Sequence, residues 1–258
     1  MWGRSFTAIS RLFALFALFA LAACSKSKSG EREVVIAAAA SLRGVLPDLA
    51  ARHEAAHVGV KVVATYGASG DLRKQVEGGA PIDGVVFASG KPVDDLIGKG
   101  KVIASSRRVL ATNVLVLIGP KGGPKLTFAT LGDLPADEKL AIGDPGAVPA
   151  GQYARDYLEK RGVYARLQGR MVLGGDVGAV LAYARRGEVA AAIVYRTEIR
   201  GISDVVELDR AGADAPRIEV VAGVVGEGKA AAEAERFFAF MASPAGQEVF
   251  KEFGFGPP

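Results

Sequence analysis

Short apolar runs alternate with amphipathic segments along most of the chain. Runs rich in Val, Ile and Ala predict strands at residues 33–40, 59–66, 84–88, 109–118, 140–142, 190–195 and 218–225. Segments with helical spacing, several with Gly just past their end, predict helices at residues 45–55, 71–77, 93–98, 149–161, 177–186, 230–241 and 245–253. Strands that alternate with helices in this way predict α/β layering around mostly parallel sheets.

Two lobes fit the length of the chain better than one, because about 225 residues remain after the N-terminal segment. The strands near residues 113 and 222 are natural places for the chain to cross between lobes. We therefore expect an α/β protein of two lobes, each a mostly parallel sheet flanked by helices. The first lobe is expected to be discontinuous, at residues 33–112 and 223–258, and the second to span residues 113–222.

The first 23 residues have the pattern of an export signal. Arg4 and Arg11 precede an apolar run that is shorter than the about 20 residues needed to span a bilayer. The run ends Leu-Ala-Ala-Cys at Cys24, which matches the bacterial lipoprotein signal. We expect removal of residues 1–23, acylation of Cys24 and a flexible tether at residues 24–32, so that the protein is anchored to a membrane in the periplasm or cell envelope. The alternative is an unmodified cysteine in an ordinary signal sequence.

The charge balance gives little support for binding to nucleic acid. The chain has 32 Lys and Arg against 28 Asp and Glu, and the signal segment accounts for two of the bases. No basic cluster stands out, and aromatic residues make up only 7% of the chain. Because Cys24 is the only cysteine, a disulfide within one chain is excluded.

Four strand-to-helix corners consist largely of small residues. They span residues 37–44, 66–71, 143–151 and 174–178. In open α/β sheets, ligands bind outside the carboxyl ends of the strands, where helix N-termini present unpaired N–H groups that favour anions. One such corner is usually a plain turn or helix cap. Four of them predict a pocket of neutral donors that holds an oxyanion without a buried counter-cation.

Five residues at these places are the candidate donors. Ser41 and Ser69 lie in small-residue connections before helices, where each could also be a simple N-cap. Ala150 and Val177 lie in the expected first turns of helices, where backbone N–H groups are free. Tyr195 ends an apolar strand, so its hydroxyl could emerge at the same edge or make one structural hydrogen bond.

A set of motifs resembles the periplasmic molybdate-binding proteins of ABC transporters, which have the type II periplasmic binding-protein fold. The motifs are Ala-Ala-Ala-Ser-Leu (38–42), Tyr-Gly-Ala-Ser-Gly (66–70), Gly-Ala-Pro-Ile-Asp (79–83), Gly-Asp-Pro-Gly-Ala-Val-Pro-Ala-Gly (143–151), Ile-Val-Tyr (193–195) and Gln-Glu-Val-Phe-Lys-Glu-Phe-Gly-Phe (247–255). The resemblance extends over residues 34–255. Residues 84–89 depart from the usual family pattern.

The resemblance implies that molybdate or tungstate binds in a cleft between the lobes by hydrogen bonds alone. It assigns hydroxyl and N–H donors to Ser41 and Ser69, backbone donors to Ala150 and Val177, and the hydroxyl donor to Tyr195. No direct bond between protein and metal, and no cofactor, is expected. The resemblance further implies a monomer that delivers its ligand to the membrane subunits of an ABC permease.

Two other functions stay open at this point. A receptor for sulfate, phosphate or an organic anion would need a similar pocket of donors. A serine-dependent hydrolase is disfavoured because the two histidines, His53 and His57, look like neighbouring surface residues of the first helix. No Gly-x-Ser-x-Gly motif is present either, so we do not expect an enzyme.

Overall fold

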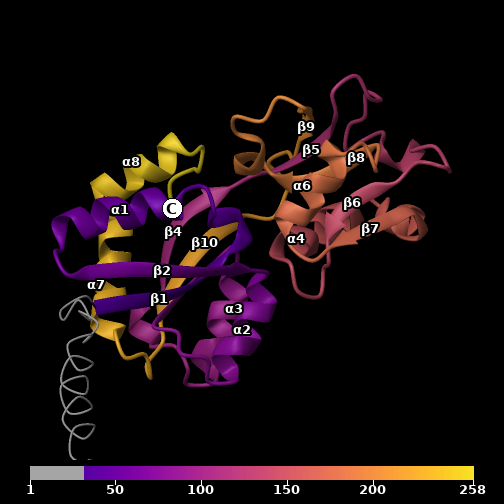
Figure 1. Ribbon diagram of the computed structural model, residues 1–258. Helices are drawn as coiled ribbons and strands as arrows, with labels where there is room; N and C mark the ends of the chain where they lie inside the picture. Colours follow the sequence, from indigo (N-terminus) through magenta and orange to yellow (C-terminus); the bar gives the residue numbers. More distant parts are fainter. Residues whose placement is uncertain (1–31) are drawn as a thin grey trace, which may run out of the picture. The chain divides into compact units, whose positions relative to one another are not determined.

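The computed structural model describes residues 32–258. The expected signal segment, Cys24 and nearly all of the expected tether lie outside these residues. Residues 32–258 form one unit with two five-stranded sheets (Figure 1). In this part of the chain, every helix is too short or too polar to cross a bilayer.

The first sheet has the strand order β2-β1-β3-β10-β4. Its strands are β1 (Arg32–Ala39), β2 (Val60–Gly67), β3 (Gly84–Phe87), β4 (Arg108–Asn113) and β10 (Ile218–Val224). Strand β10 runs antiparallel to its neighbours β3 and β4, and β1 pairs in parallel with β2 and β3. The sheet is therefore mixed: four of its five strands run in the same direction, as the sequence predicts, and β10 runs against them.

Helices cover both faces of the first sheet (Figure 1). They are α1 (Leu46–Ala56), α2 (Ser69–Glu77), α3 (Gly90–Gly98), α7 (Ala231–Ala242) and α8 (Pro244–Glu252). Strand β1 shows how the two faces are filled: Ile36 packs in the core with α1, α7 and α8, whereas Ala37 packs in the core with α2 and α3. The alternation follows from the two-residue period of a strand.

The second sheet has the strand order β7-β6-β8-β5-β9. Its strands are β5 (Leu115–Pro120), β6 (Leu140–Gly143), β7 (Met171–Gly174), β8 (Ala191–Tyr195) and β9 (Val205–Arg210). Strand β5 is antiparallel to β8 and β9, whereas β6 pairs in parallel with β7 and β8. The helices of this half are α4 (Pro149–Lys160), α5 (Tyr164–Leu167) and α6 (Val177–Arg185). The predicted α/β architecture with two mostly parallel sheets is confirmed.

The expected long strand at residues 109–118 is wrong in detail. The chain leaves the first sheet at Asn113 and enters the second at Leu115. The Asn113 side chain accepts a hydrogen bond from the N–H of Val114 at 2.9 Å and donates one to Thr197 at 2.9 Å. These side-chain bonds take the place of ladder bonds at the break, which lies at the polar pair Thr112 and Asn113 inside the otherwise apolar run.

The other crossing between the sheets lies before Ile218. All of β10 belongs to the first sheet, so the expected domain boundary at residues 222 and 223 falls inside a strand. The chain itself crosses between the sheets in the segment between β9 and β10. The division into two domains itself remains a prediction.

Candidate anion-binding site

The four small-residue corners form two pairs, one at the edge of each sheet. In the first sheet, Ala39 at the end of β1 lies opposite Gly67 at the end of β2, which places the corners at 37–44 and 66–71 side by side. In the second sheet, the N–H of Asp144 donates to the carbonyl of Gly174 at 2.9 Å. Each pair follows from parallel strands that end in register.

Two contacts join the corners of one sheet to those of the other. The N–H of Gly70 in the first turn of α2 donates to the carbonyl of Ala147 at 3.0 Å. The guanidinium of Arg43 lies 3.6 Å from the carboxylate of Asp176. The four corners therefore form a closed ring. The helices that begin at these corners, beside both sheets, place their N-termini around it.

Both serines are buried at this ring, and neither is an N-cap. Ser41 lies in a short 3-10 helix (Ala40–Leu42) directly after β1, and Ser69 is the first residue of α2, which Ala68 caps. The Ser69 Oγ accepts a hydrogen bond from the N–H of Ala88 at 3.3 Å. Because this hydroxyl acts as an acceptor there, its own proton remains available for a second partner.

The helix that carries Ala150 approaches β6 very closely. Ala150 is the second residue of α4 and is 1% exposed. Pro149 fits the first position because the N–H that it lacks would have no partner inside the helix. A Cβ on Gly151 would lie only 1.9 Å from the carbonyl oxygen of Gly143, so this close approach requires glycine. The first turn of α4, which contains Ala150, thus lies directly at the end of β6.

Val177 begins α6 behind a side-chain cap. The Asp176 carboxylate accepts a hydrogen bond from the N–H of Ala179 at 2.8 Å and so caps the helix. Val177 is buried, and its N–H belongs to the first turn, where a helix offers no carbonyl partner of its own. The same carboxylate pairs with Arg43, so its charge is partly compensated beside the ring.

Tyr195 has the most informative side chain of the site. It is the last residue of β8, is 1% exposed, and its buried hydroxyl has no hydrogen-bond partner among the described residues. The described residues supply no partner for the alternative, one structural hydrogen bond. Burial, with a smaller contribution from Tyr153 and Glu198, raises the pKa of this phenol well above its ordinary value. The Tyr195 phenol therefore stays neutral, and a buried hydroxyl without a partner costs about 1–3 kcal/mol.

Two charged residues at the ring were missed by sequence reasoning. Arg43 follows Ser41 by two positions, and Glu198 follows Tyr195 by three, in a 3-10 helix at Arg196–Ile199. Burial and the nearby Asp176 raise the pKa of Glu198 to about 8, against a smaller opposing effect of Arg43. The only sequence signal for them was their short distance from the predicted donors.

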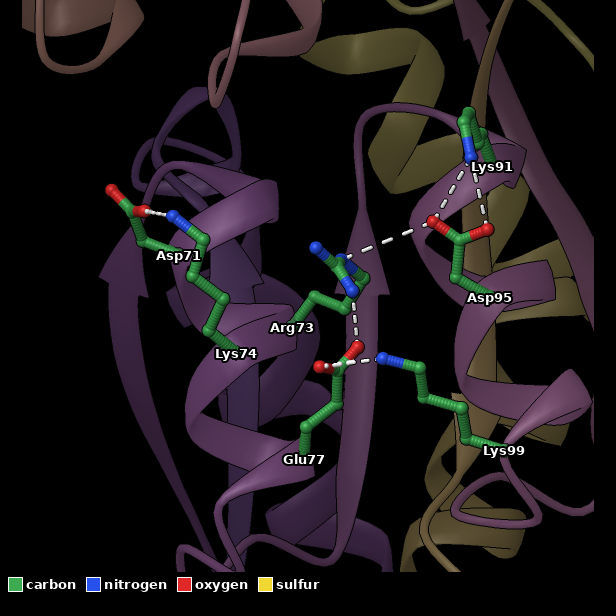
Figure 2. A network of polar contacts seen from close by, with 7 residues as sticks. All are labelled: Asp71, Arg73, Lys74, Glu77, Lys91, Asp95 and Lys99. Carbon is green, nitrogen blue, oxygen red and sulfur yellow. Dashed lines mark hydrogen bonds and ion pairs between the residues drawn. The ribbon is translucent and has the colours of Figure 1, made fainter.

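Ion pairs on the exposed side of α2 hold that helix against α3 (Figure 2). Arg73 pairs with Glu77 one turn later on α2, and Glu77 also pairs with Lys99 at 2.9 Å. Arg73 lies 3.9 Å from Asp95 of α3. Exposed pairs contribute little one by one, but as a network they link α2, which begins with Ser69, to α3 and the residue that follows it.

The two histidines lie away from this ring. His53 is not a surface residue as expected: it is fully buried, and its ring lies 5.2 Å from that of Phe237 of α7. Residues 32–258 also contain no group of three or more His, Cys, Asp or Glu side chains that could hold a metal ion. The ring combines hydroxyl and backbone N–H groups with the Arg43–Asp176 ion pair and Glu198. Hydroxyl and N–H donors of this kind suit an anion.

Comparison with known proteins agrees with this chemistry. Residues 34–256 match the family described as bacterial extracellular solute-binding protein. The chain is 32% identical to the molybdate-binding protein ModA of Escherichia coli (strain K12), over 91% of this chain and 93% of that protein. It is 33% identical to a protein of Bacillus subtilis (strain 168) named as a candidate ABC-transporter substrate-binding lipoprotein, YvgL, over 91% and 92% of the two chains.

Solved structures show the same fold. The periplasmic molybdate-binding protein of Azotobacter vinelandii superposes with a TM-score of 0.79 at 24% identity, over 87% of this chain and 99% of that chain. The type II periplasmic binding-protein fold expected from the motifs is confirmed. With its matching family profile and its two sheets joined at a ring of donors, the chain belongs to the bacterial extracellular solute-binding proteins.

Proposed function

We propose that the protein binds molybdate, and tungstate of nearly the same shape, at the ring of corners and delivers it to an ABC permease. The unpaired buried hydroxyl of Tyr195 carries the proposal, because a protein retains such a group at this cost where a ligand supplies the acceptor. The molybdate-binding relative from E. coli, similar over nearly its whole length, supports the choice of anion.

The proposed ligand set consists of neutral donors from both sheets. Ser41 and Ser69 supply hydroxyls and N–H groups, Ala150 and Val177 supply N–H groups at helix starts, and Tyr195 supplies its hydroxyl. A dianion offers only acceptors, so every group of this set can point toward it. The positive ends of α2, α4 and α6 add a favourable field without a buried cation.

A receptor for another oxyanion is the alternative. The sulfate-binding protein SubI from Mycobacterium tuberculosis H37Rv shares the fold with a TM-score of 0.74 at 19% identity, over 88% of this chain and 87% of that chain. Likeness at this level shows the fold alone. Discrimination between these anions depends on the size of the pocket, which a binding experiment tests directly.

The test is a calorimetric titration of the protein without its first 24 residues. We expect tight binding of molybdate and tungstate, with sulfate and phosphate weaker by at least about a hundredfold. Each tight ligand should also raise the melting temperature, because it binds only the folded protein. Tight sulfate binding together with weak molybdate binding would overturn the choice of ligand in favour of the alternative.

We also propose a lipid anchor on Cys24. The lipoprotein signal at residues 21–24 supports it, and the B. subtilis relative is named as a lipoprotein. Expression of the full chain in a bacterium fed with radioactive palmitate should label the protein, and Cys24→Ser should abolish the label. Label that persists in Cys24→Ser would exclude this anchor.

A further inference from the structure

We propose that Glu198 couples anion binding to the uptake of one proton at the same site. This inference rests on the proposed function and adds a regulation to it. A carboxylate beside a dianion opposes binding, whereas a protonated carboxyl does not. The geometry around Glu198 makes it the group that decides between these two states.

The position of Glu198 relative to the donors is the first part of the argument. Its 3-10 helix follows β8 directly, and Glu198 lines a cavity of about 230 Å³. Ser41 lines the same cavity from the first sheet, and Gly178 lines it from the first turn of α6. An anion held by Ser41, Val177 and Tyr195 would therefore lie within the electrostatic reach of Glu198.

The charged groups around Glu198 are the second part. Asp176, the N-cap of α6, lies near Glu198. Arg43, which follows the 3-10 helix at Ala40–Leu42, also lies near it and is paired with Asp176. Arg200 lines the cavity from the end of the same 3-10 helix, but its guanidinium lies over the ring of Phe253, 4.8 Å from the centroid. The α8 side of the cavity presents the uncharged Phe253 and Phe255. One arginine thus faces two carboxylates.

The consequence is a carboxyl that is mostly protonated at neutral pH. Burial and Asp176 raise the pKa of Glu198 to about 8, and a bound dianion raises it further by the same repulsion. Tyr195 stays neutral over this range, because its own pKa is raised well above the usual value. Molybdate is a dianion throughout, so Glu198 is the group at the ring whose charge changes between pH 7 and 9.

The test is molybdate titration by calorimetry from pH 6.5 to 9 in pairs of buffers with different ionisation enthalpies. We expect no proton uptake at pH 6.5, about half a proton per anion near pH 8, and about tenfold weaker binding at pH 9 than at pH 7. Glu198→Gln should bind with an affinity that is flat over this range and without proton uptake. Glu248→Gln removes one exposed carboxylate of α8 and should behave as the unaltered protein.

The outcomes separate the two proposals. Molybdate binding with the same pH profile in Glu198→Gln as in the unaltered protein would reject the coupling and leave the ligand assignment intact. Absence of molybdate binding at every pH would reject both. As a measurement that needs no variant, the carboxyl carbon of Glu198 should titrate by NMR with a midpoint near 8 in the free protein and higher with molybdate bound.

Discussion

The N–H of Gly70 donates to the carbonyl of Ala147 at 3.0 Å and so links the first turn of α2 to the corner that precedes α4. The two residues lie in corners at the edges of different sheets, and the contact lies between the buried Ser69 and the helix N-terminus that carries Ala150. A Cβ on Gly70 would lie 2.8 Å from that carbonyl oxygen and 3.0 Å from the Cα of Ala147. The two corners can meet only because residue 70 has no side chain.

Gly70→Ala should therefore weaken molybdate binding by about tenfold or more, close to 1.4 kcal/mol. The added methyl group holds the two corners apart, but alanine favours the helix, so the unliganded protein should keep its melting temperature. Gly98→Ala at the end of α3, where a Cβ meets nothing within 4 Å, is the matched control. Equal affinities for molybdate in the two variants, measured by calorimetry, would show that the contact between Gly70 and Ala147 does not affect binding.

Tyr195→Phe should weaken molybdate binding by about 1–3 kcal/mol and leave the unliganded protein equally or more stable. The variant removes a donor to the anion and, without ligand, removes a buried hydroxyl that lacks a partner. Tyr157→Phe offers the opposite pattern, because the buried Tyr157 hydroxyl bonds to Gly212 at 3.0 Å and to Arg161 at 2.5 Å. That control should lose stability and retain affinity. Titration and urea unfolding of both variants check the prediction, and a large loss of stability in Tyr195→Phe would contradict it.

The two serines should contribute similarly to ligand binding but differently to the stability of the protein. Ser69→Ala removes the acceptor for the N–H of Ala88, so it should lower both the affinity and the free energy of unfolding, each by about 1–3 kcal/mol. Ser41→Ala should lower the affinity by a similar amount with a smaller loss of stability. Calorimetry with urea denaturation separates the two effects. If Ser41→Ala bound molybdate as well as the unaltered protein, Ser41 would not be part of the ligand set.

Local patterns were sufficient to predict most elements and the corners. Strand β1 and the corner that holds Ser41 are examples, because a continuous apolar run and a proline in the first helical turn are local signals. Strands β7 and β9 were missed because they are short or polar edge strands whose neighbours come from distant parts of the chain. Tertiary packing also decides the environment of Glu198, whose raised pKa depends on Asp176 and Arg43 from other elements. Local sequence does not carry that information.

The stability of the unliganded protein should fall as the pH falls through the range of histidine titration. Both ring nitrogens of the buried His53 lack partners among the described residues, and burial with the nearby His57 lowers the pKa of His53 below 6.5. As the pH falls, the unfolded chain therefore takes up a proton on His53 before the folded protein does. The free energy of unfolding is at its full value above the pKa of His53 in the unfolded chain. Below that pKa it declines, by at most about 1.4 kcal/mol per pH unit from this group. His53→Phe, which can pack with Phe237 and Phe240, should remove this contribution, whereas Arg52→Lys should not. Urea unfolding of the three proteins from pH 7.5 to 5 measures the difference, and an unchanged slope in His53→Phe would contradict the assignment.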